Sequence, residues 1–299
     1  MIRSHYFYFL MHNIAARFWK HKMPLLASFK ITYRCNLKCR SCPFWRMAPM
    51  QISYSDALQI MDELFARGVR LLIFEGGEPF LWKDGEYSLD QLVQYARQRF
   101  FRVGITTNGL LPLKSPADII WVSIDGLKQT HEANRGVCFD KIMHNIDSSS
   151  HPRIFANITI NKLNYQEIPA LIKFLDKKVR GITIQFYYPF PNSEDLALSN
   201  SERKAVLEKL IGLKKNGYPI LDSISVLEAL KDNQWRCHDW LIASAEPDGR
   251  INIGCYLKDR AEISCDQCGF AAHAEISKAF EWNWEAISVG KRTFNFRVV

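Results

Sequence analysis

The sequence LLASFKITYRCNLKCRSC, residues 25–42, decides the fold. Residues 25–33 are mostly apolar and include β-branched and aromatic residues, which is typical of a buried strand. Three thiols follow at once, Cys35, Cys39 and Cys42, in the spacing C-x-x-x-C-x-x-C. Thiolates are soft ligands that suit zinc or an iron–sulfur cluster. We therefore expect a metal centre in the loop at the end of this strand.

The number of ligands separates the two kinds of centre. A structural zinc site normally has four protein ligands, but no fourth Cys or His lies near residues 35–42. A 4Fe–4S cluster held by three thiolates leaves one iron open for a ligand that is not protein. Three unrelated buried cysteines are the remaining alternative, and their close spacing disfavours it.

Beyond this loop, strand and helix patterns alternate along the chain. Further strands are expected at 69–74, 102–107, 119–124, 154–160 and 182–188. Helices are expected at 54–68, 89–98, 139–146, 165–177 and 202–216. Ser201 is the expected N-cap of the last helix. Alternation with short loops indicates right-handed parallel βα units, and six units make an α/β fold of the partial (β/α)6 parallel barrel type.

The length of 299 residues, with 47% hydrophobic residues, suits one large domain with a small appendage. We expect an N-terminal amphipathic helix in 1–24, the barrel in 25–218, and a β-hairpin plus C-terminal helix in 219–299. Residues 1–24 interleave aromatic and basic side chains. The favoured interpretation is a helix packed across the barrel, and the alternative is a helix on a membrane surface.

Net charge and cysteine content restrict the partners and the compartment. The formal net charge of +8 is compatible with an anionic partner, but no nucleic-acid-binding module is visible, so no nucleic acid is expected. The chain has eight cysteines and no convincing secretory signal. We expect a reducing cytoplasm in which thiols are kept for metal, with peripheral membrane contact through 1–24 as an addition.

At Cys35, Cys39 and Cys42 the chain resembles the radical S-adenosylmethionine (radical SAM) superfamily, whose signature has this spacing. The resemblance implies a 4Fe–4S cluster whose open iron binds S-adenosylmethionine. It also implies reductive cleavage of this cofactor to a 5′-deoxyadenosyl radical, with electrons from a reductant such as ferredoxin or flavodoxin. Family members often have an aromatic residue just before the third cysteine, where this chain has Ser41.

The resemblance also implies a cofactor pocket made by turns at the ends of strands. Gly76-Gly77-Glu78-Pro79 follows the strand 69–74, and paired glycines let backbone carbonyls come close to an ammonium group. The other pocket residues implied are Thr107, Asn108, Ser123 and Asp125. Asp125 is also a candidate for orienting the substrate. Asn157 and Gln185 are weaker candidates, for which a structural role is as well supported.

A second set of thiols lies near the C-terminus. Its members are Cys237, Cys255, Cys265 and Cys268. The turn at 247–249 predicts a β-hairpin between the first two, and the last two form a C-x-x-C pair. A closed set of four thiolates suits zinc. However, the arrangement resembles the twitch extension, a short relative of the SPASM domain, which implies a second, auxiliary 4Fe–4S cluster.

Cys138 belongs to neither set. It follows the strand 119–124 near the expected barrel mouth, where a thiol can donate a hydrogen atom to a substrate radical. A lone Cys beside Val137 and Phe139 more often packs as a small hydrophobe.

The function expected is that of a radical SAM enzyme acting on an unknown substrate, which the sequence leaves open among a peptide, a small molecule and a lipid-related compound. The alternative is a zinc-stabilised binding protein on a partial barrel, without catalysis.

Overall fold

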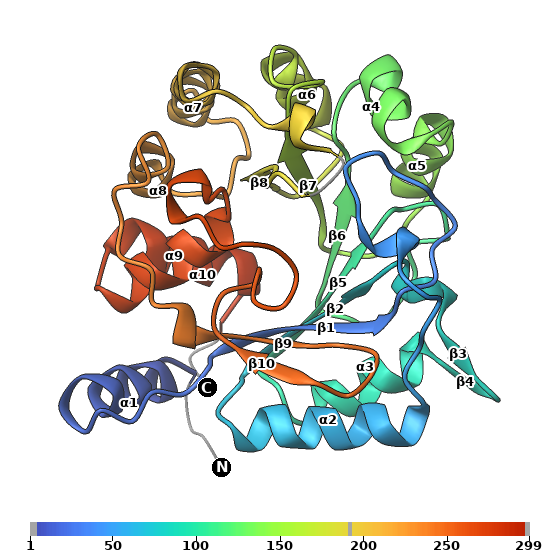
Figure 1. Ribbon diagram of the computed structural model, residues 1–299, viewed down its shortest axis with the longest axis vertical. Coiled ribbons are helices and arrows are strands. Elements are labelled where there is room, and N and C mark those ends of the chain that lie inside the picture. The colour runs from blue at the N-terminus through green and yellow to red at the C-terminus, as the bar shows by residue number, and fades with distance from the viewer. Residues whose placement is uncertain (1–4, 191–192, 297–299) are drawn as a thin grey trace.

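The computed structural model describes residues 5–190 and 193–296, and Figure 1 shows a curved sheet with helices outside it. In these residues, the main sheet has the strand order β10-β9-β1-β2-β5-β6-β7-β8. The strand bounds are β1 Leu26–Thr32, β2 Leu71–Gly76, β5 Arg102–Thr107, β6 Ile119–Ser123, β7 Ile154–Ile160, β8 Ile182–Phe186, β9 Ile242–Ala245 and β10 Ile251–Ile253. The six strands from β1 to β8 in this order are parallel, which confirms the expected partial barrel. Two short strands, β3 Lys83–Asp84 and β4 Tyr87–Ser88, form a separate hairpin.

Helices cover the outer face of the sheet, as βα units require (Figure 1). Their bounds are α2 Tyr54–Ala66, α3 Leu89–Arg97, α4 Lys128–Arg135, α5 Phe139–Asp147, α6 Ile168–Leu175 and α7 Asn200–Lys215. The N-cap of α7 is Ser199, and the expectation of Ser201 is wrong. The Ser199 side chain accepts a hydrogen bond from the Glu202 amide, and the Glu202 carboxylate accepts one from the Ser199 amide. This reciprocal cap needs a Glu three residues after the cap, a spacing that Ser199 has and Ser201 lacks.

Alternation along β1 divides its side chains between two layers. Ala27, Phe29 and Ile31 pack outward in a buried cluster with residues of α2 and α3. Lys30 therefore lies on the inner face, where its partner in register is Glu75 of β2. A second apolar cluster fills the inner face near the N-terminal ends of the strands, and its members are Ile73, Ile119, Trp121, Phe155 and Leu221. This packing leaves the C-terminal ends of the strands to the polar residues.

The predicted C-terminal hairpin exists and extends the barrel sheet. β10 runs antiparallel to β9, and β9 runs parallel to β1, with Leu26 opposite Ile242. The following helices are α8 Ile224–Ala229, α9 Ala271–Phe280 and α10 Trp284–Phe294. On the other side of the sheet, the Phe186 amide at the end of β8 donates a 2.9 Å hydrogen bond to the Gly269 carbonyl. Residues 219–299 are thus joined to both sides of the barrel, and the domain boundary at 218 stays a prediction.

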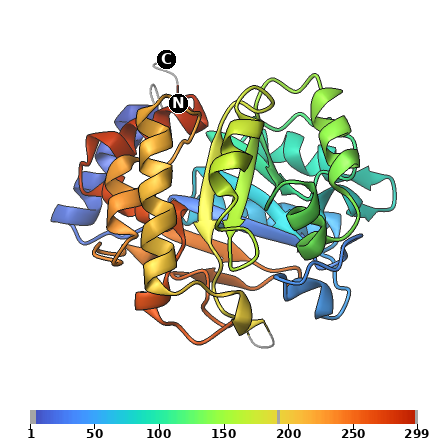
Figure 2. The same cartoon turned by 90° about the horizontal axis from the view of Figure 1, so that it is seen from above.

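The N-terminal helix α1, His5–Phe18, is packed against the body of the protein, beside the C-terminal helices (Figures 1 and 2). The Tyr8 hydroxyl donates to the Gly68 carbonyl at 2.9 Å, and the Asn13 side chain donates to the Phe280 carbonyl at 2.8 Å. Its outer side exposes Phe7 and Phe18. No helix in the described part of the chain is long and apolar enough to cross a membrane. Contact of this segment with a membrane surface stays a prediction, and residues 1–4 and 297–299 lie outside the described residues.

Candidate active site and thiol sets

The first thiol set lies in the loop that follows β1. Cys39 is buried, and Cys35 and Cys42 are partly buried. The loop is fixed by α4, because Asn134 accepts hydrogen bonds from two of its amides, those of Arg40 at 2.8 Å and Ser41 at 3.2 Å. All eight cysteines of the chain are free thiols, so no disulfide competes for these sulfurs.

Nitrogen donors face two of the three sulfurs. The Arg135 guanidinium lies 3.9 Å from the Cys39 sulfur, and the Asn108 side-chain amide lies 3.9 Å from the Cys35 sulfur. Burial raises the pKa of Cys39 to about 12 and also raises that of Cys35, so both stay protonated without a metal. Metal binding deprotonates a thiol outright, and donors aimed at sulfur stabilise the resulting thiolate. The donor set therefore fits a thiolate-bound cluster.

Asp125 acts on this loop through Arg135. One carboxylate oxygen of Asp125 accepts from the Asn134 side chain at 2.8 Å and from Arg135 Nε at 2.6 Å, and the other accepts from the Thr159 amide at 3.0 Å. Burial opposes the charge of Arg135, but Asp125 and the Cys39 thiol outweigh it, and the pKa of Arg135 is raised. Both Asp125 oxygens are thus occupied, which gives this residue a positioning role.

Glu78 ties two of the predicted turns together. Its side chain is fully buried, and one oxygen accepts from the Thr107 hydroxyl at 2.8 Å and the Phe80 amide at 3.1 Å. The other oxygen accepts from the Asn108 amide at 2.8 Å. Burial raises the pKa of Glu78 to about 7 despite these donors. Pro79 begins the short 3-10 helix that follows. The structure thus brings the 76–79 and 107–108 turns to the same end of the sheet as the thiol loop.

The close packing of the turn against the end of β1 requires the paired glycines. A Cβ atom on Gly76 would lie 2.2 Å from the Thr32 carbonyl oxygen, and one on Gly77 would lie 2.3 Å from the Arg34 carbonyl oxygen. The Gly77 amide donates to the Thr32 carbonyl at 2.7 Å. The turn can therefore approach the end of β1 only without side chains, whatever ligand it also contacts.

The other predicted pocket residues lie on neighbouring strands. Ser123 at the end of β6 is in register with Asn157 of β7. The Asn157 side chain accepts from the Thr183 hydroxyl at 3.1 Å, and Gln185 of β8 donates to the Thr159 hydroxyl at 3.1 Å. These partly buried polar side chains alternate with the apolar residues that pack outward, so they face the inside of the barrel.

Cys138 is placed apart from both thiol sets. It is buried in the apolar cluster of the outer helical layer together with Phe139, and its sulfur lies 3.4 Å from Nε2 of His131. Burial raises the pKa of this thiol to about 11. These surroundings support the packing role, and hydrogen donation to a substrate radical stays a prediction.

A family model described as the radical SAM superfamily matches residues 29–175. Residues 29–175 form a radical SAM domain. Its relatives include the Fe-coproporphyrin III synthase of Methanosarcina barkeri, 28% identical over 289 residues, which cover 84% of this chain and 70% of the relative. The pre-heme d1 synthase of Dinoroseobacter shibae is 28% identical over 188 residues, or 58% of this chain and 46% of the relative.

The fold is also similar to that of a solved structure. The crystal structure of SuiB from Streptococcus suis bound to S-adenosylmethionine matches with a TM-score of 0.66 and 16% identity, over 94% of this chain and 69% of that one. The radical SAM domain makes the chain an enzyme that uses S-adenosylmethionine and a 4Fe–4S cluster. The expectation of an enzyme is confirmed in preference to the zinc-stabilised binding protein.

In this radical SAM enzyme, the second thiol set gathers beside β9 and β10. Burial raises the pKa of Cys237 to about 12, and the nearby thiols of Cys268, Cys255 and Cys265 raise it further. The four thiols are therefore near neighbours. In the described ranges, no group of three or more His, Cys, Asp or Glu side chains could hold a single metal ion as placed. The ligand roles of both thiol sets stay predictions.

Arg203 of α7 lies beside the second thiol set. The side chain is buried, and its guanidinium donates to the Cys268 carbonyl and, at 2.9 Å, to the Asn233 side chain. Its Nε–H group has no partner in the part of the chain that the structure describes. Buried donors are nearly always paired. A sulfur-rich anionic group held by these thiols would accept a hydrogen bond from the Nε–H group of Arg203.

An ionic network that the sequence analysis missed lies on the inner face of the barrel. Lys30 is fully buried and lies 3.0 Å from the Glu75 carboxylate. Burial opposes both charges, but their attraction outweighs it, so the pKa of Lys30 is raised and that of Glu75 is lowered. The ammonium also lies 4.4 Å from the ring centre of Tyr256. The sequence signal for this network was a lysine inside the apolar strand 25–33, because a buried charge needs a partner of opposite charge.

Proposed function

We propose that Cys35, Cys39 and Cys42 hold the catalytic 4Fe–4S cluster, next to an S-adenosylmethionine pocket made by the turns at 76–79 and 107–108. The observation that carries the proposal is the set of nitrogen donors aimed at the loop sulfurs. Parallel barrels place their active sites at this end of the strands. When bound, the cluster supplies the electron that cleaves S-adenosylmethionine to methionine and a 5′-deoxyadenosyl radical.

The protein's own contribution is to position these groups and to exclude water. Asp125 holds Arg135 against the thiol loop, and Glu78 holds the two turns together. The apolar cluster around Trp121 closes the barrel below, which keeps a reactive radical away from solvent on that side. The pocket walls then include Ser123, at the end of β6.

The second thiol set extends the proposal. We infer that it binds an auxiliary 4Fe–4S cluster, as in twitch-type relatives, with all four irons held by protein thiolates. The mutual effect of the thiols on pKa and the unpaired Nε–H group of Arg203 support this. Such a cluster carries an electron between the substrate radical and a ferredoxin- or flavodoxin-type partner.

For the substrate, we propose an acidic small molecule of the porphyrin type. Exposed cations lie in and beside the thiol loop, and they are Arg34, Lys38 and Arg46, together with Arg40, which is paired with Asp195. They would attract carboxylate groups to the mouth of the barrel. The names of the two relatives above, an Fe-coproporphyrin III synthase and a pre-heme d1 synthase, point to the same class.

The experiment that tests the cluster is anaerobic reconstitution with iron and sulfide, followed by assay of 5′-deoxyadenosine. Replacing Cys35, Cys39 and Cys42 by Ala should abolish the product. Cys138→Ala is the matched control, since Cys138 belongs to neither set. This variant should still form 5′-deoxyadenosine. Formation of 5′-deoxyadenosine at the native rate by the triple variant would refute the first proposal.

The same triple variant tests the second thiol set. Reconstituted without oxygen, it should bind about four irons if the auxiliary cluster exists, and a single zinc if the set is a structural clip. For the substrate, Fe-coproporphyrin III is titrated into the holoenzyme and its visible absorption is followed. Binding that Arg34→Gln and Arg46→Gln weaken supports the class, and absence of binding refutes it.

A further inference from the structure

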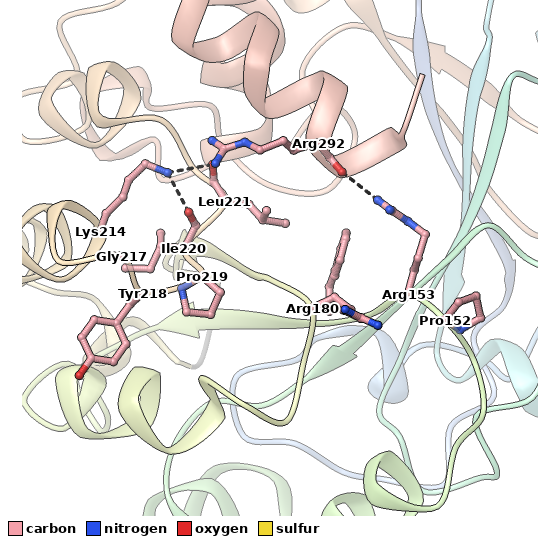
Figure 3. Close-up of a pocket in the computed structure, with 11 residues that line it drawn as sticks. Pro152, Arg153, Arg180, Lys214, Gly217, Tyr218, Pro219, Ile220, Leu221 and Arg292 are labelled. Atoms are coloured by element: carbon pink, nitrogen blue, oxygen red, sulfur yellow. Dashed lines mark hydrogen bonds between the residues drawn. The ribbon is translucent and has the colours of Figure 1, made fainter. Parts of the chain in front are cut away.

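A cavity of about 500 Å³ lies at the other end of the barrel, where β7 and β8 begin (Figure 3). Arg153 comes directly before β7, and Arg180 lies two residues before β8. Lys214 of α7 and Arg292 of α10 complete its charged lining. None of the described residues that line it is acidic. The cavity therefore has four positive side chains from four separate segments of the chain, and no carboxylate among the described residues that line it.

Two of these cations are held in place by carbonyl groups. Arg153 donates to the carbonyl of Arg292 at 2.8 Å and to that of Thr293 at 2.6 Å, and Lys214 donates to the carbonyl of Ile220 at 2.7 Å (Figure 3). Carbonyls orient a cation but do not neutralise it. Both charges are thus fixed at the cavity and available to an anion.

The other two cations, Arg180 and Arg292, are exposed. Within residues 5–190 and 193–296, neither guanidinium has an ion pair or a side-chain hydrogen bond. The four charges also repel one another. Burial and then Arg292 lower the pKa of Lys214, and burial, Arg102 and Arg180 lower that of Arg153.

Carboxylates behind the lining offset part of this repulsion. Asp118 acts on Arg153, whereas Asp222, Glu275 and Glu285 act on Lys214. Burial raises the pKa of Asp222 to about 6 and that of Glu275 to about 8, so these two carry less than a full charge near neutral pH. A concentration of like charge remains, and a bound anion would relieve it.

We infer that this cavity binds a small polyanion that carries two or more phosphate or carboxylate groups. Its volume lies in the range of small-molecule sites, roughly 300–1,000 Å³. The planar fork of arginine matches the oxygens of both groups in pairs. Phe155 and Leu221 line the cavity and belong to the apolar cluster that closes the barrel. The site is therefore separate from the thiol loop.

The anion would join parts of the chain that are distant in sequence. Arg153 and Arg180 belong to the barrel, whereas Arg292 belongs to the C-terminal helix α10. A ligand that bridges them binds only the folded protein, so it raises the melting temperature by an amount that grows with the logarithm of its concentration relative to its Kd. Thermal stability is thus a readout of binding that does not depend on catalysis.

The experiment uses the full-length holoenzyme, with tripolyphosphate and citrate as separate probes and sodium chloride at equal ionic strength as the reference. At least one probe should bind by calorimetry and raise the melting temperature above that in chloride. The double variant Arg180→Gln with Arg292→Gln should bind it at least tenfold more weakly, since removing one charge-assisted hydrogen bond weakens binding by about tenfold. The single variant Arg67→Gln, which removes an exposed arginine at the C-terminal end of α2, should bind as the native protein does.

The inference is overturned if neither probe exceeds chloride, or if the double variant keeps native affinity. Binding of tripolyphosphate alone assigns phosphate groups to the ligand, and binding of citrate alone assigns carboxylates. If the double variant melts at a lower temperature than the native protein in the absence of any probe, the single variant Arg180→Gln is used for the binding test instead. The exposed side chain of Arg180 holds no other described residue in place.

Discussion

At the scale of single residues, Arg135 connects the barrel to the thiol loop. Its side chain is nearly buried, pairs with the buried Asp125 and reaches the Cys39 sulfur. Arg135→Gln leaves the Asp125 carboxylate buried without its cation, which typically costs about 3–5 kcal/mol. We expect this loss in the free energy of unfolding measured with urea, together with lower iron occupancy of the first thiol set.

Arg40→Gln is the control for this prediction. Arg40 lies in the same loop and pairs with Asp195, but both side chains are about half exposed. Exposed pairs contribute at most about 1 kcal/mol. Equal effects of the two substitutions on stability and iron content would show that burial of the Arg135 pair is not what fixes the loop.

At the scale of elements, the start of α7 depends on one hydroxyl. Ser199→Ala removes the capping interaction with Glu202 and should lower the free energy of unfolding by about 1 kcal/mol. Ser201→Ala removes a serine two residues away that caps no amide among those described, and it should change stability by less than half as much. A larger loss from Ser201→Ala in urea unfolding would contradict the assignment of the cap.

The docking of α8 and α9 gives the stability a pH dependence. The Glu275 carboxyl of α9 accepts from the Ser223 amide. Burial and then Asp222 raise its pKa to about 8 from an ordinary 4.5, and burial raises that of Asp222 to about 6 from 3.8. The folded protein therefore holds protons that the unfolded chain has released. Stability from these groups is fully present below about pH 4 and is lost as the pH rises towards about 8.

Glu275→Gln removes the larger of these two titrations. Urea unfolding of native and variant proteins at pH 5 and pH 8.5 should give a smaller loss of stability for the variant over this interval, by on the order of 2–4 kcal/mol. The comparison between the two proteins cancels the titration of groups that they share. Parallel pH profiles would rule out Glu275 as the source.

The sequence predicts elements well where apolar residues repeat at the period of a strand or helix. The strands at 102–107 and 154–160 have their expected bounds. α4, Lys128–Arg135, was missed because it is polar over most of its length, yet it supplies Asn134 and Arg135 to the thiol loop. Asp125, buried at the end of a strand and in need of a cation, was the indirect signal for it.

At the scale of the whole molecule, the thiol motif and the strand–helix alternation predict the fold and the end of the barrel that carries the site. Pairings between distant segments could not be predicted. The Lys30–Glu75 pair meets Tyr256 only because residues of the C-terminal region return to β1. Local periodicity carries no information about such pairings, so the polar interior of the barrel had to be seen in three dimensions.

The pairing of β1 with β9 can be tested by truncation. A chain that ends at residue 230 lacks β9, so one edge of β1 has no partner, and unpaired apolar edges aggregate. A chain that ends at residue 258 keeps β9 and β10 but also lacks α9 and α10. We expect the longer chain to give the larger soluble fraction on anaerobic expression. Equal solubility would mean that the edge of β1 is protected in another way.

The position of β9 beside β1 also orders events on the ribosome. Leu26 leaves the ribosome early, but its neighbour Ile242 is among the later residues to be made. The strand that carries the first thiols is therefore flanked on both sides only when synthesis is nearly complete, and chains that pair such remote segments fold slowly. Iron would then enter the first thiol set after translation, and a scaffold or chaperone that delivers it would meet a chain whose last strands have already docked.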